Sequence, residues 1–197
     1  MASLQELRSL IRAGRESRNL EYKGAQPWRK VRSQVARTAL GMANIEGGGH
    51  IIVGVDEIRG RFVPRGLSPD MLRTFRSDEI KAHVNGFADP FVELSIEHVE
   101  ADGLTFVVIR VEEFAEVPVV ASKAGEGIRR GALYVRSLRT TETAEVQNQT
   151  DMRTVIDLAT AKGIARNLRT LARAGISLTD LVAESSEARF REEGRGL

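Results

Sequence analysis

A glycine triplet, Gly47-Gly48-Gly49, joins a predicted helix to a predicted buried strand. The run from His50 to Val55 is apolar and rich in β-branched residues, as expected of a strand that is buried on both faces. The preceding segment has apolar residues at helical spacing after Pro27, which suits a first helical turn: Val31, Val35, Ala39 and Met42. The triplet is therefore either a tight helix-to-strand connection or a backbone cradle for phosphate. It is not a Walker A loop, because no Lys-Ser or Lys-Thr follows it.

A second turn signal, Asp102-Gly103, separates two segments of alternating polarity and predicts a β-hairpin over 91–111. Ser3 and Glu6 form a capping box that opens an N-terminal helix ending at Gly14. We also expect short strands at 20–23, 118–120 and 132–136, and helices at 68–86 and from 143 to about 162, continuing over 164–171. These elements predict the α+β class, with a mixed, partly antiparallel sheet of about five or six strands, two or three packed helices, and helices at both termini.

The length of 197 residues fits one domain with a helical appendage. We expect an N-terminal helix at 1–13, a domain over 14–162, and a C-terminal helical segment with a polar tail at 163–197. The chain has no cysteine, which excludes disulfides, zinc–thiolate sites and cysteine nucleophiles. Because no apolar run approaches the about 18 residues of a membrane span and no signal pattern opens the sequence, we expect a cytoplasmic protein with no membrane partner.

The charge is unevenly distributed although the formal net charge is only +2. Residues 1–45 carry a net charge of +6, whereas residues 78–116 carry −8. Of the 29 basic residues, 24 are arginines, a preference that suits bidentate contacts with phosphate. One part of the chain could face nucleic acid while another faces away. A GC-rich genome, in which arginine codons replace lysine codons, is the alternative explanation.

Three carboxylates, Glu16, Glu21 and Asp56, are candidates for a metal-assisted phosphodiester site. Such a site would use Mg²⁺ or Mn²⁺, which prefer hard oxygen ligands. Five residues separate Glu16 from Glu21, so their side chains diverge in a strand or a helix and converge only if the chain bends between them. Asp56 follows the buried strand, where polar side chains emerge at a sheet edge. The alternative is that each acid is a surface group or forms an ion pair with Lys23 or Arg18.

Two aromatic residues, Tyr22 and Trp28, flank the basic N-terminal region and could stack on a nucleobase. Packing of Trp28 beneath the second helix is the alternative. The three histidines are scattered and show no metal-ligand spacing.

In combination, these motifs resemble the Schlafen AlbA_2 domain family, whose bacterial members have also been labelled DNA-binding or divergent AAA-4 proteins. The family pattern is Glu-Ser-x-x-Leu-Glu-(Phe/Tyr)-Lys, then a helix ending in Ala-Asn-x-x-Gly-Gly, then an apolar strand that closes in Gly-Val-Asp. A later element, Pro118 followed by the strand at 131–136 and a Thr/Ala-rich segment, also fits, so the resemblance covers about residues 14–160. The matching residues are Glu16, Ser17, Leu20, Glu21, Tyr22, Lys23, Ala43, Asn44, Gly47, Gly48, Gly54, Val55 and Asp56.

The resemblance implies a function for these residues. In animal Schlafen proteins the corresponding domain is a tRNA and rRNA endoribonuclease with three acidic residues and a divalent metal, which fall here on Glu16, Glu21 and Asp56. The animal domain has two such lobes, and this chain is long enough for one, so a homodimer with a basic groove between subunits is implied. Two departures from the pattern are Glu46 within the glycine motif and Arg136-Ser137-Leu138-Arg139 in place of the usual Arg-x-Gly-Ser.

The leading interpretation is therefore a nucleic-acid-binding domain that acts as a metal-dependent endoribonuclease on structured RNA such as tRNA. Glu16, Glu21 and Asp56 would bind Mg²⁺ or Mn²⁺, and Lys23 would stabilise charge that develops on the phosphate. One alternative is a non-catalytic DNA- or RNA-binding regulator or accessory subunit, and another is a nucleotide-binding or protein-interaction component. Candidate contacts with the nucleic-acid backbone are Arg29, Lys30, Arg32, Arg37, Arg129, Arg130, Arg136 and Arg139.

Overall fold

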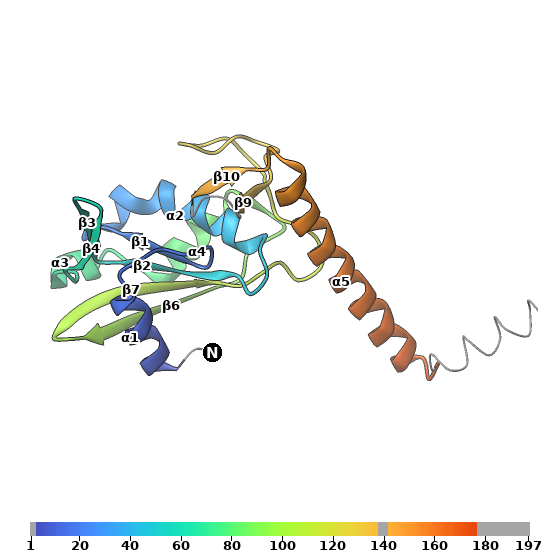
Figure 1. Ribbon diagram of the computed structural model, residues 1–197, viewed down its shortest axis with the longest axis horizontal. Coiled ribbons are helices and arrows are strands. Elements are labelled where there is room, and N and C mark those ends of the chain that lie inside the picture. The colour runs from blue at the N-terminus through green and yellow to red at the C-terminus, as the bar shows by residue number, and fades with distance from the viewer. Residues whose placement is uncertain (1–2, 138–141, 177–197) are drawn as a thin grey trace, which may run out of the picture. The chain divides into compact units, whose positions relative to one another are not determined.

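The computed structural model of the protein describes residues 3–137 and 142–176. The chain divides into two compact units, with the boundary between Leu158 and Ala159 in helix α5 (Gln149–Arg173). All described strands and the other described helices belong to the first unit (Figure 1). The predicted polar tail falls largely outside the described residues, and the expected domain boundaries stay predictions.

A four-stranded sheet forms the centre of the first unit, in the order β1 (Leu20–Lys23), β2 (Gly49–Val53), β7 (Leu104–Val111) and β6 (Leu94–Ala101). Strands β1 and β2 are parallel, whereas β2 pairs with β7 and β7 with β6 in antiparallel ladders. The β6–β7 hairpin turns at Asp102 and Gly103, both of which have positive φ, as the Asp-Gly signal predicts. The predicted α+β class with a mixed, partly antiparallel sheet is confirmed.

The central sheet has fewer strands than expected because several short strands pair separately. After β2 the chain leaves the sheet at Gly54, where φ is +116° and a Cβ atom would lie 2.9 Å from the Phe106 ring. The other described strands form three two-stranded antiparallel ladders: β3 (Val55–Ile58) with β4 (Arg61–Pro64), β5 (Ala88–Asp89) with β8 (Val120–Ala121), and β9 (Tyr134–Arg136) with β10 (Thr143–Glu145).

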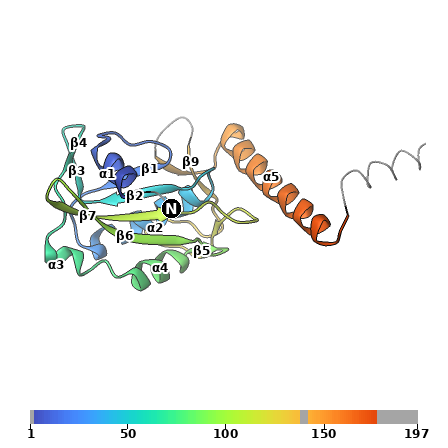
Figure 2. The same cartoon turned by 90° about the horizontal axis from the view of Figure 1, so that it is seen from below.

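Helices cover both faces of the central sheet. Helix α1 (Leu4–Arg12) packs on β6, and helix α2 (Trp28–Ala43) packs on β2 and β7 (Figures 1 and 2). Because successive residues of a strand face opposite ways, Tyr22 joins Leu7 and Ile11 of α1 in one core cluster, while Glu21 faces the α2 side. Strands β9 and β10 pack on α2 and complete this side of the molecule.

The glycine triplet is a tight connection between α2 and β2. Gly47 and Gly48 have φ values of +75° and +61°. A Cβ atom on Gly48 would lie 2.0 Å from the Val111 carbonyl oxygen, a distance that no side chain can adopt. The amide of Gly47 donates a hydrogen bond to the Glu113 carboxylate at 2.7 Å. The backbone here therefore packs on the end of β7.

Two local predictions need correction, and the structure selects one of the two alternatives left open for Trp28. The helix expected from Thr143 begins only at Gln149, because residues 143–145 pair with β9 as a strand, although α5 does continue through Gly163 as predicted. The helix expected over 68–86 is two helices, α3 (Pro69–Leu72) and α4 (Ser77–Asn85). Trp28 is buried against Phe75 and His83, so it cannot stack on a base without unfolding this part of the core.

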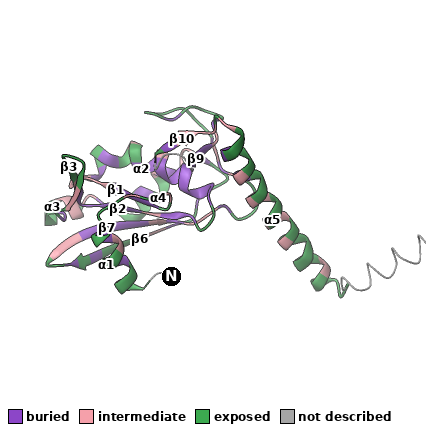
Figure 3. Ribbon diagram, viewed as in Figure 1, coloured by how far each residue is buried: buried purple, intermediate pink, exposed green. Residues whose placement is uncertain are grey.

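Burial follows this layered arrangement. The central strands β2 and β7 are largely buried, whereas most of α5 is exposed (Figure 3). Over residues 3–137 and 142–176, no helix combines the length and the apolar character needed to cross a lipid bilayer.

Candidate functional site

A cavity of about 630 Å³ lies between β1, α2 and the β3–β4 hairpin, and is bordered by the segments around Gly127 and Thr143. Three of the predicted site residues, Glu16, Glu21 and Lys23, line it together with Arg37. The structure thus brings together residues that are far apart in the sequence. The remaining lining residues are Tyr22, Gly24, Ser33, Gln34, Thr38, Val55, Glu57, Phe62, Glu126, Gly127, Glu142 and Thr143.

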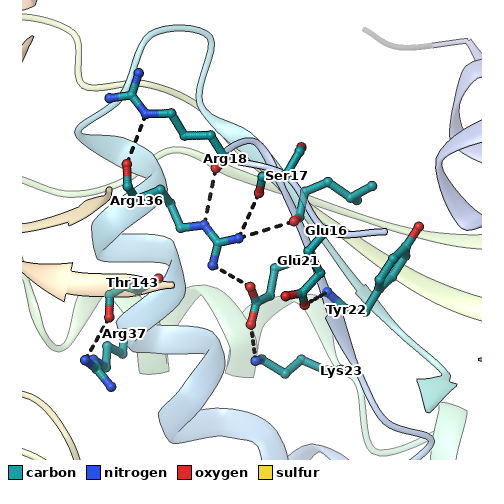
Figure 4. Close-up of polar contacts among 10 residues, drawn as sticks. Glu16, Ser17, Arg18, Glu21, Tyr22, Lys23, Arg37, Arg136 and Thr143 are labelled. Atoms are coloured by element: carbon teal, nitrogen blue, oxygen red, sulfur yellow. Dashed lines mark hydrogen bonds and ion pairs between the residues drawn. The ribbon is translucent and has the colours of Figure 1, made fainter. Parts of the chain in front are cut away.

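Glu21 is the most tightly held carboxylate of this cavity. Its side chain is 11 % exposed and accepts hydrogen bonds from Lys23 on one oxygen and from Arg136 on the other (Figure 4). Burial of an unpaired carboxylate is strongly unfavourable, and Lys23 and Arg136 compensate for the burial of Glu21 by pairing with it. Strand β1 supplies Lys23 from the same face, two residues along the strand.

Glu16 reaches the same cavity because the chain bends sharply between the two glutamates. Ser17 and Leu20 exchange two backbone hydrogen bonds, of 3.0 and 3.2 Å, which turn the chain before β1 begins. The Glu16 carboxylate then accepts a 2.9 Å hydrogen bond from the backbone amide of Tyr22 (Figure 4). Burial raises the pKa of Glu16, and the nearby charge of Glu21 raises it further, while the Tyr22 amide opposes both effects.

Arg136, which is distant in the sequence, fixes this bend by direct contact. Its side chain is 1 % exposed and, besides Glu21, it donates to the carbonyl oxygens of Ser17 at 2.8 Å and of Arg18 and Leu20 at 3.3 Å each. The Arg18 side chain in turn donates to the Arg136 carbonyl at 3.0 Å. Arg136 was expected to contact nucleic acid, but in this structure it is a buried link between β9 and the Glu16–Glu21 segment.

Asp56 is not among the residues that line the cavity. One of its oxygens accepts a 2.8 Å hydrogen bond from the Ala25 amide, and the other lies 3.9 Å from Nε of Arg65. Because alternate residues of β3 face opposite ways, Glu57 and Val55 line the cavity instead. The described residues contain no group of three or more acidic or histidine side chains placed to hold a metal. The predicted three-acid arrangement is therefore not assembled here, and metal binding stays a prediction.

The predicted phosphate contacts separate into several groups. Arg29, Lys30 and Arg32 are exposed on the first half of α2, while Arg37 lines the cavity and donates to the Thr143 carbonyl at 2.8 Å. Arg129 and Arg130 are exposed beside the cavity segment at 126–127, and Arg129 forms an ion pair with Glu145. Arg139 lies outside the described residues.

Acidic side chains predominate in the cavity, which the sequence patterns did not indicate. Its lining carries five glutamates against two cations, Lys23 and Arg37, and the glutamates are Glu16, Glu21, Glu57, Glu126 and Glu142. Glu57 could have been recognised from the period of two along β3, once it is known that the extended segment is interrupted at Gly54. Glu126 and Glu142 belong to loops whose position depends on tertiary packing, so no local signal identifies them.

Asn44, a residue of the family-like motif, has a structural position away from the cavity. It is fully buried, and its amide nitrogen donates to the carbonyls of Val119, Tyr134 and Leu40 at 2.7, 2.9 and 3.2 Å. Its oxygen accepts from the Val119 amide at 2.8 Å. Asn44 therefore ties the end of α2 to β9 and to the segment before β8.

Solved structures that match this chain include the following two proteins. The DIP2311 protein of Corynebacterium diphtheriae superimposes with a TM-score of 0.50 at 16% identity, over 77% of this chain and 27% of its own. The N-terminal domain of an ATP-dependent DNA helicase RecG-related protein of Nitrosomonas europaea gives a TM-score of 0.47 at 25% identity, over 66% of this chain and 89% of that domain. The chain thus corresponds to about a quarter of the first protein, and that likeness concerns the fold alone. A search of curated proteins gave no match.

The sequence itself was also compared with models of protein families. The model described as Schlafen, AlbA_2 matches residues 16–145, a span that begins at Glu16 and ends in β10. This span includes β1, α2, the β3–β4 hairpin and β9, which supply most of the cavity. Because the match covers more than half of the chain, the protein belongs to the Schlafen AlbA_2 family.

Proposed function

We propose that this protein binds structured RNA such as tRNA at the acidic cavity and cleaves it as a divalent-metal-dependent endoribonuclease. Membership of the Schlafen AlbA_2 family supports the coarser assignment, a nucleic-acid-binding domain. The observation that supports the finer one is the convergence of Glu16 and Glu21, beside Lys23, in a single cavity.

The charge of the cavity supports a requirement for a cation. Five glutamates and two basic residues would repel a phosphodiester unless a positive ion accompanied it. Carboxylate oxygens are the donors that Mg²⁺ and Mn²⁺ prefer, so the chemistry of the lining fits such an ion. Glu16 and Glu21 would hold it, and either Asp56 or Glu57 would complete the set after a side-chain rearrangement. The bound ion would neutralise phosphate charge and activate water.

The protein's own groups have separate roles in this proposal. Lys23 lies beside Glu21 and would stabilise negative charge that develops on the phosphate. Burial raises the pKa of Glu16, so its carboxylate is a stronger base than that of an exposed glutamate. The exposed basic residues on α2 and at Arg129 and Arg130 would bind the RNA backbone outside the acidic cavity.

The test is a cleavage assay on tRNA with Mn²⁺, with EDTA as the metal-free control. Glu16→Gln and Glu21→Gln keep the size of each side chain and remove its charge, and we expect each to reduce cleavage by about 100-fold or more. Asp56→Asn and Glu57→Gln, compared side by side, identify the third carboxylate. Equal cleavage by the wild type and Glu21→Gln, or no cleavage by either, would refute the catalytic part of the proposal.

A second candidate is a DNA- or RNA-binding module without catalysis. It is favoured by the pairing of both Glu21 oxygens with Lys23 and Arg136, and by the position of Asp56 outside the cavity lining. This candidate requires salt-sensitive binding that persists in EDTA and in the Glu21→Gln variant. Competition between tRNA and duplex DNA in a fluorescence anisotropy titration would show which nucleic acid is preferred.

We also propose a homodimer, since the chain supplies one lobe where the animal Schlafen domain has two. Sedimentation velocity with and without RNA would test it. A strict monomer at micromolar concentration under both conditions would exclude this arrangement.

A further inference from the structure

We infer that the cavity receives a single unpaired nucleobase, which stacks on Phe62 and meets polar side chains of α2. This inference rests on the proposed function and narrows its substrate class to RNA with an unpaired nucleotide at the bound position. It derives from the two chemically different walls of the cavity, which are described in turn below.

The first wall is aromatic and is fixed from behind. Phe62 of β4 is half-buried and lines the cavity, while its ring packs against Tyr22 with a centroid separation of 5.0 Å and an interplanar angle of 48°. Tyr22 itself is 4 % exposed and donates its hydroxyl to the Leu10 carbonyl, so it cannot move aside easily. Phe62 therefore presents an aromatic surface that is already in place before a ligand arrives, which is the arrangement that stacks bases without sequence preference.

The second wall is polar and comes from one face of a helix. Ser33, Gln34, Arg37 and Thr38 lie on α2 at spacings of one and four residues, so they share the side that borders the cavity. A hydroxyl can both donate and accept a hydrogen bond, and the Gln34 amide offers one group of each kind. Such side chains can pair with the edge of a base whose Watson–Crick partner is absent.

The cavity size and charge agree with one nucleotide rather than a duplex. Its volume of about 630 Å³ lies within the range of about 300–1,000 Å³ that is typical of small-ligand sites. A base that is paired and stacked in a helix cannot enter a cavity between two walls, so it must be unpaired or turned out of the helix. Lys23 and Arg37 lie in the same lining and can meet the phosphates on either side of that base.

The experiment compares a fluorescent RNA hairpin with a blunt duplex of the same stem, by anisotropy, with wild type and three variants. Phe62→Leu keeps an apolar contact with the core but removes the ring, Phe62→Tyr keeps the ring, and Phe91→Leu removes an aromatic side chain that is 80% exposed and is not part of the lining. We expect Phe62→Leu to weaken hairpin binding by about 5- to 150-fold, with little change for the duplex, for Phe62→Tyr or for Phe91→Leu.

A second readout reports the base directly. With 2-aminopurine in the loop, wild-type protein should quench its fluorescence by stacking, and Phe62→Leu should not, while circular dichroism verifies that the variant is folded. Equal wild-type affinity for hairpin and duplex, or unchanged hairpin binding by folded Phe62→Leu, overturns the nucleobase site and leaves the proposed function intact. No binding of either RNA by the wild type instead overturns the proposed function itself.

Discussion

Replacement of Arg136 by methionine should destabilise the protein strongly, although Arg136 was expected to be a surface contact. Methionine retains most of the apolar length of the side chain and removes its charge and its hydrogen bonds. Four hydrogen bonds are lost, which now hold Glu21 and the carbonyls of Ser17, Arg18 and Leu20. The Ser17 and Leu20 carbonyls keep their backbone partners in the turn. The main cost therefore comes from the Glu21 carboxylate and the Arg18 carbonyl, which each lose the hydrogen bond from Arg136.

The expected loss follows from these contacts. Removal of one partner of a buried ion pair costs about 3–5 kcal/mol, because the other charge stays buried without compensation. Lys23 still pairs with Glu21, so we expect the lower end, about 3 kcal/mol in the free energy of unfolding. In a chain of this size that loss corresponds to a decrease in Tm of about 6–12 °C.

Urea denaturation followed by circular dichroism measures this quantity. Arg129→Met is the matched control, because Arg129 also pairs with a glutamate but on the exposed surface, and its unfolding midpoint should stay close to that of the wild type. The double variant Arg136→Met/Glu21→Gln should recover part of the stability, since the uncompensated charge is then absent. A loss below about 1 kcal/mol for Arg136→Met, or no recovery in the double variant, would refute this account of the buried link.

Three further predictions use the same measurement. Asn44→Leu leaves the Val119 amide and at least two buried carbonyls without their partner, and should cost about 3 kcal/mol or more, with an unchanged midpoint as the contradicting result. Gly48→Ala should reduce the free energy of unfolding far more than Gly47→Ala. Both glycines have positive φ, but a Cβ on Gly48 would lie 2.0 Å from a carbonyl oxygen, whereas the nearest atom to a Cβ on Gly47 is at 3.9 Å. Equal losses of stability in the two variants would exclude the clash as the cause. Glu16→Gln should make the protein more stable than wild type near neutral pH but not near pH 4. Because the pKa of Glu16 is raised, the folded protein binds this proton more tightly than the unfolded chain, so the proton stabilises the wild type below the usual glutamate pKa of about 4.3 and this stabilisation is lost as the pH rises. A variant that is less stable than wild type at neutral pH would contradict this sign.

Local signals predicted the elements whose geometry is determined within a few residues. The Asp102-Gly103 hairpin and the glycine connection after α2 both depend on positive φ, which the sequence marks directly. The segment Thr143–Glu145 is a strand and not part of the expected helix because it pairs with β9 in an antiparallel ladder, and this pairing overrides local preference.

Local sequence signals predicted the candidate site less well than they predicted these elements. Spacing alone makes Glu16 and Glu21 diverge, and only the turn at Ser17–Leu20, held by Arg136, brings them to one cavity. The resemblance to the Schlafen AlbA_2 family, whose sequence pattern contains both glutamates, assigned them to one site, whereas periodicity alone did not. Whether Asp56 or Glu57 faces the cavity depends on where β3 begins after Gly54, and a shift of one residue exchanges the two side chains.

The contact between Arg136 and Glu21 joins residues that are 115 positions apart. The cavity therefore cannot form while the protein is still being synthesised and β9 is inside the ribosome. Closing a loop of this length carries an entropic penalty that favours late formation, after the central sheet and α2 are in place. Until then Glu21 has only Lys23 as its partner. We therefore expect the acidic cavity to assemble late in folding, because it depends on a contact between distant parts of the chain.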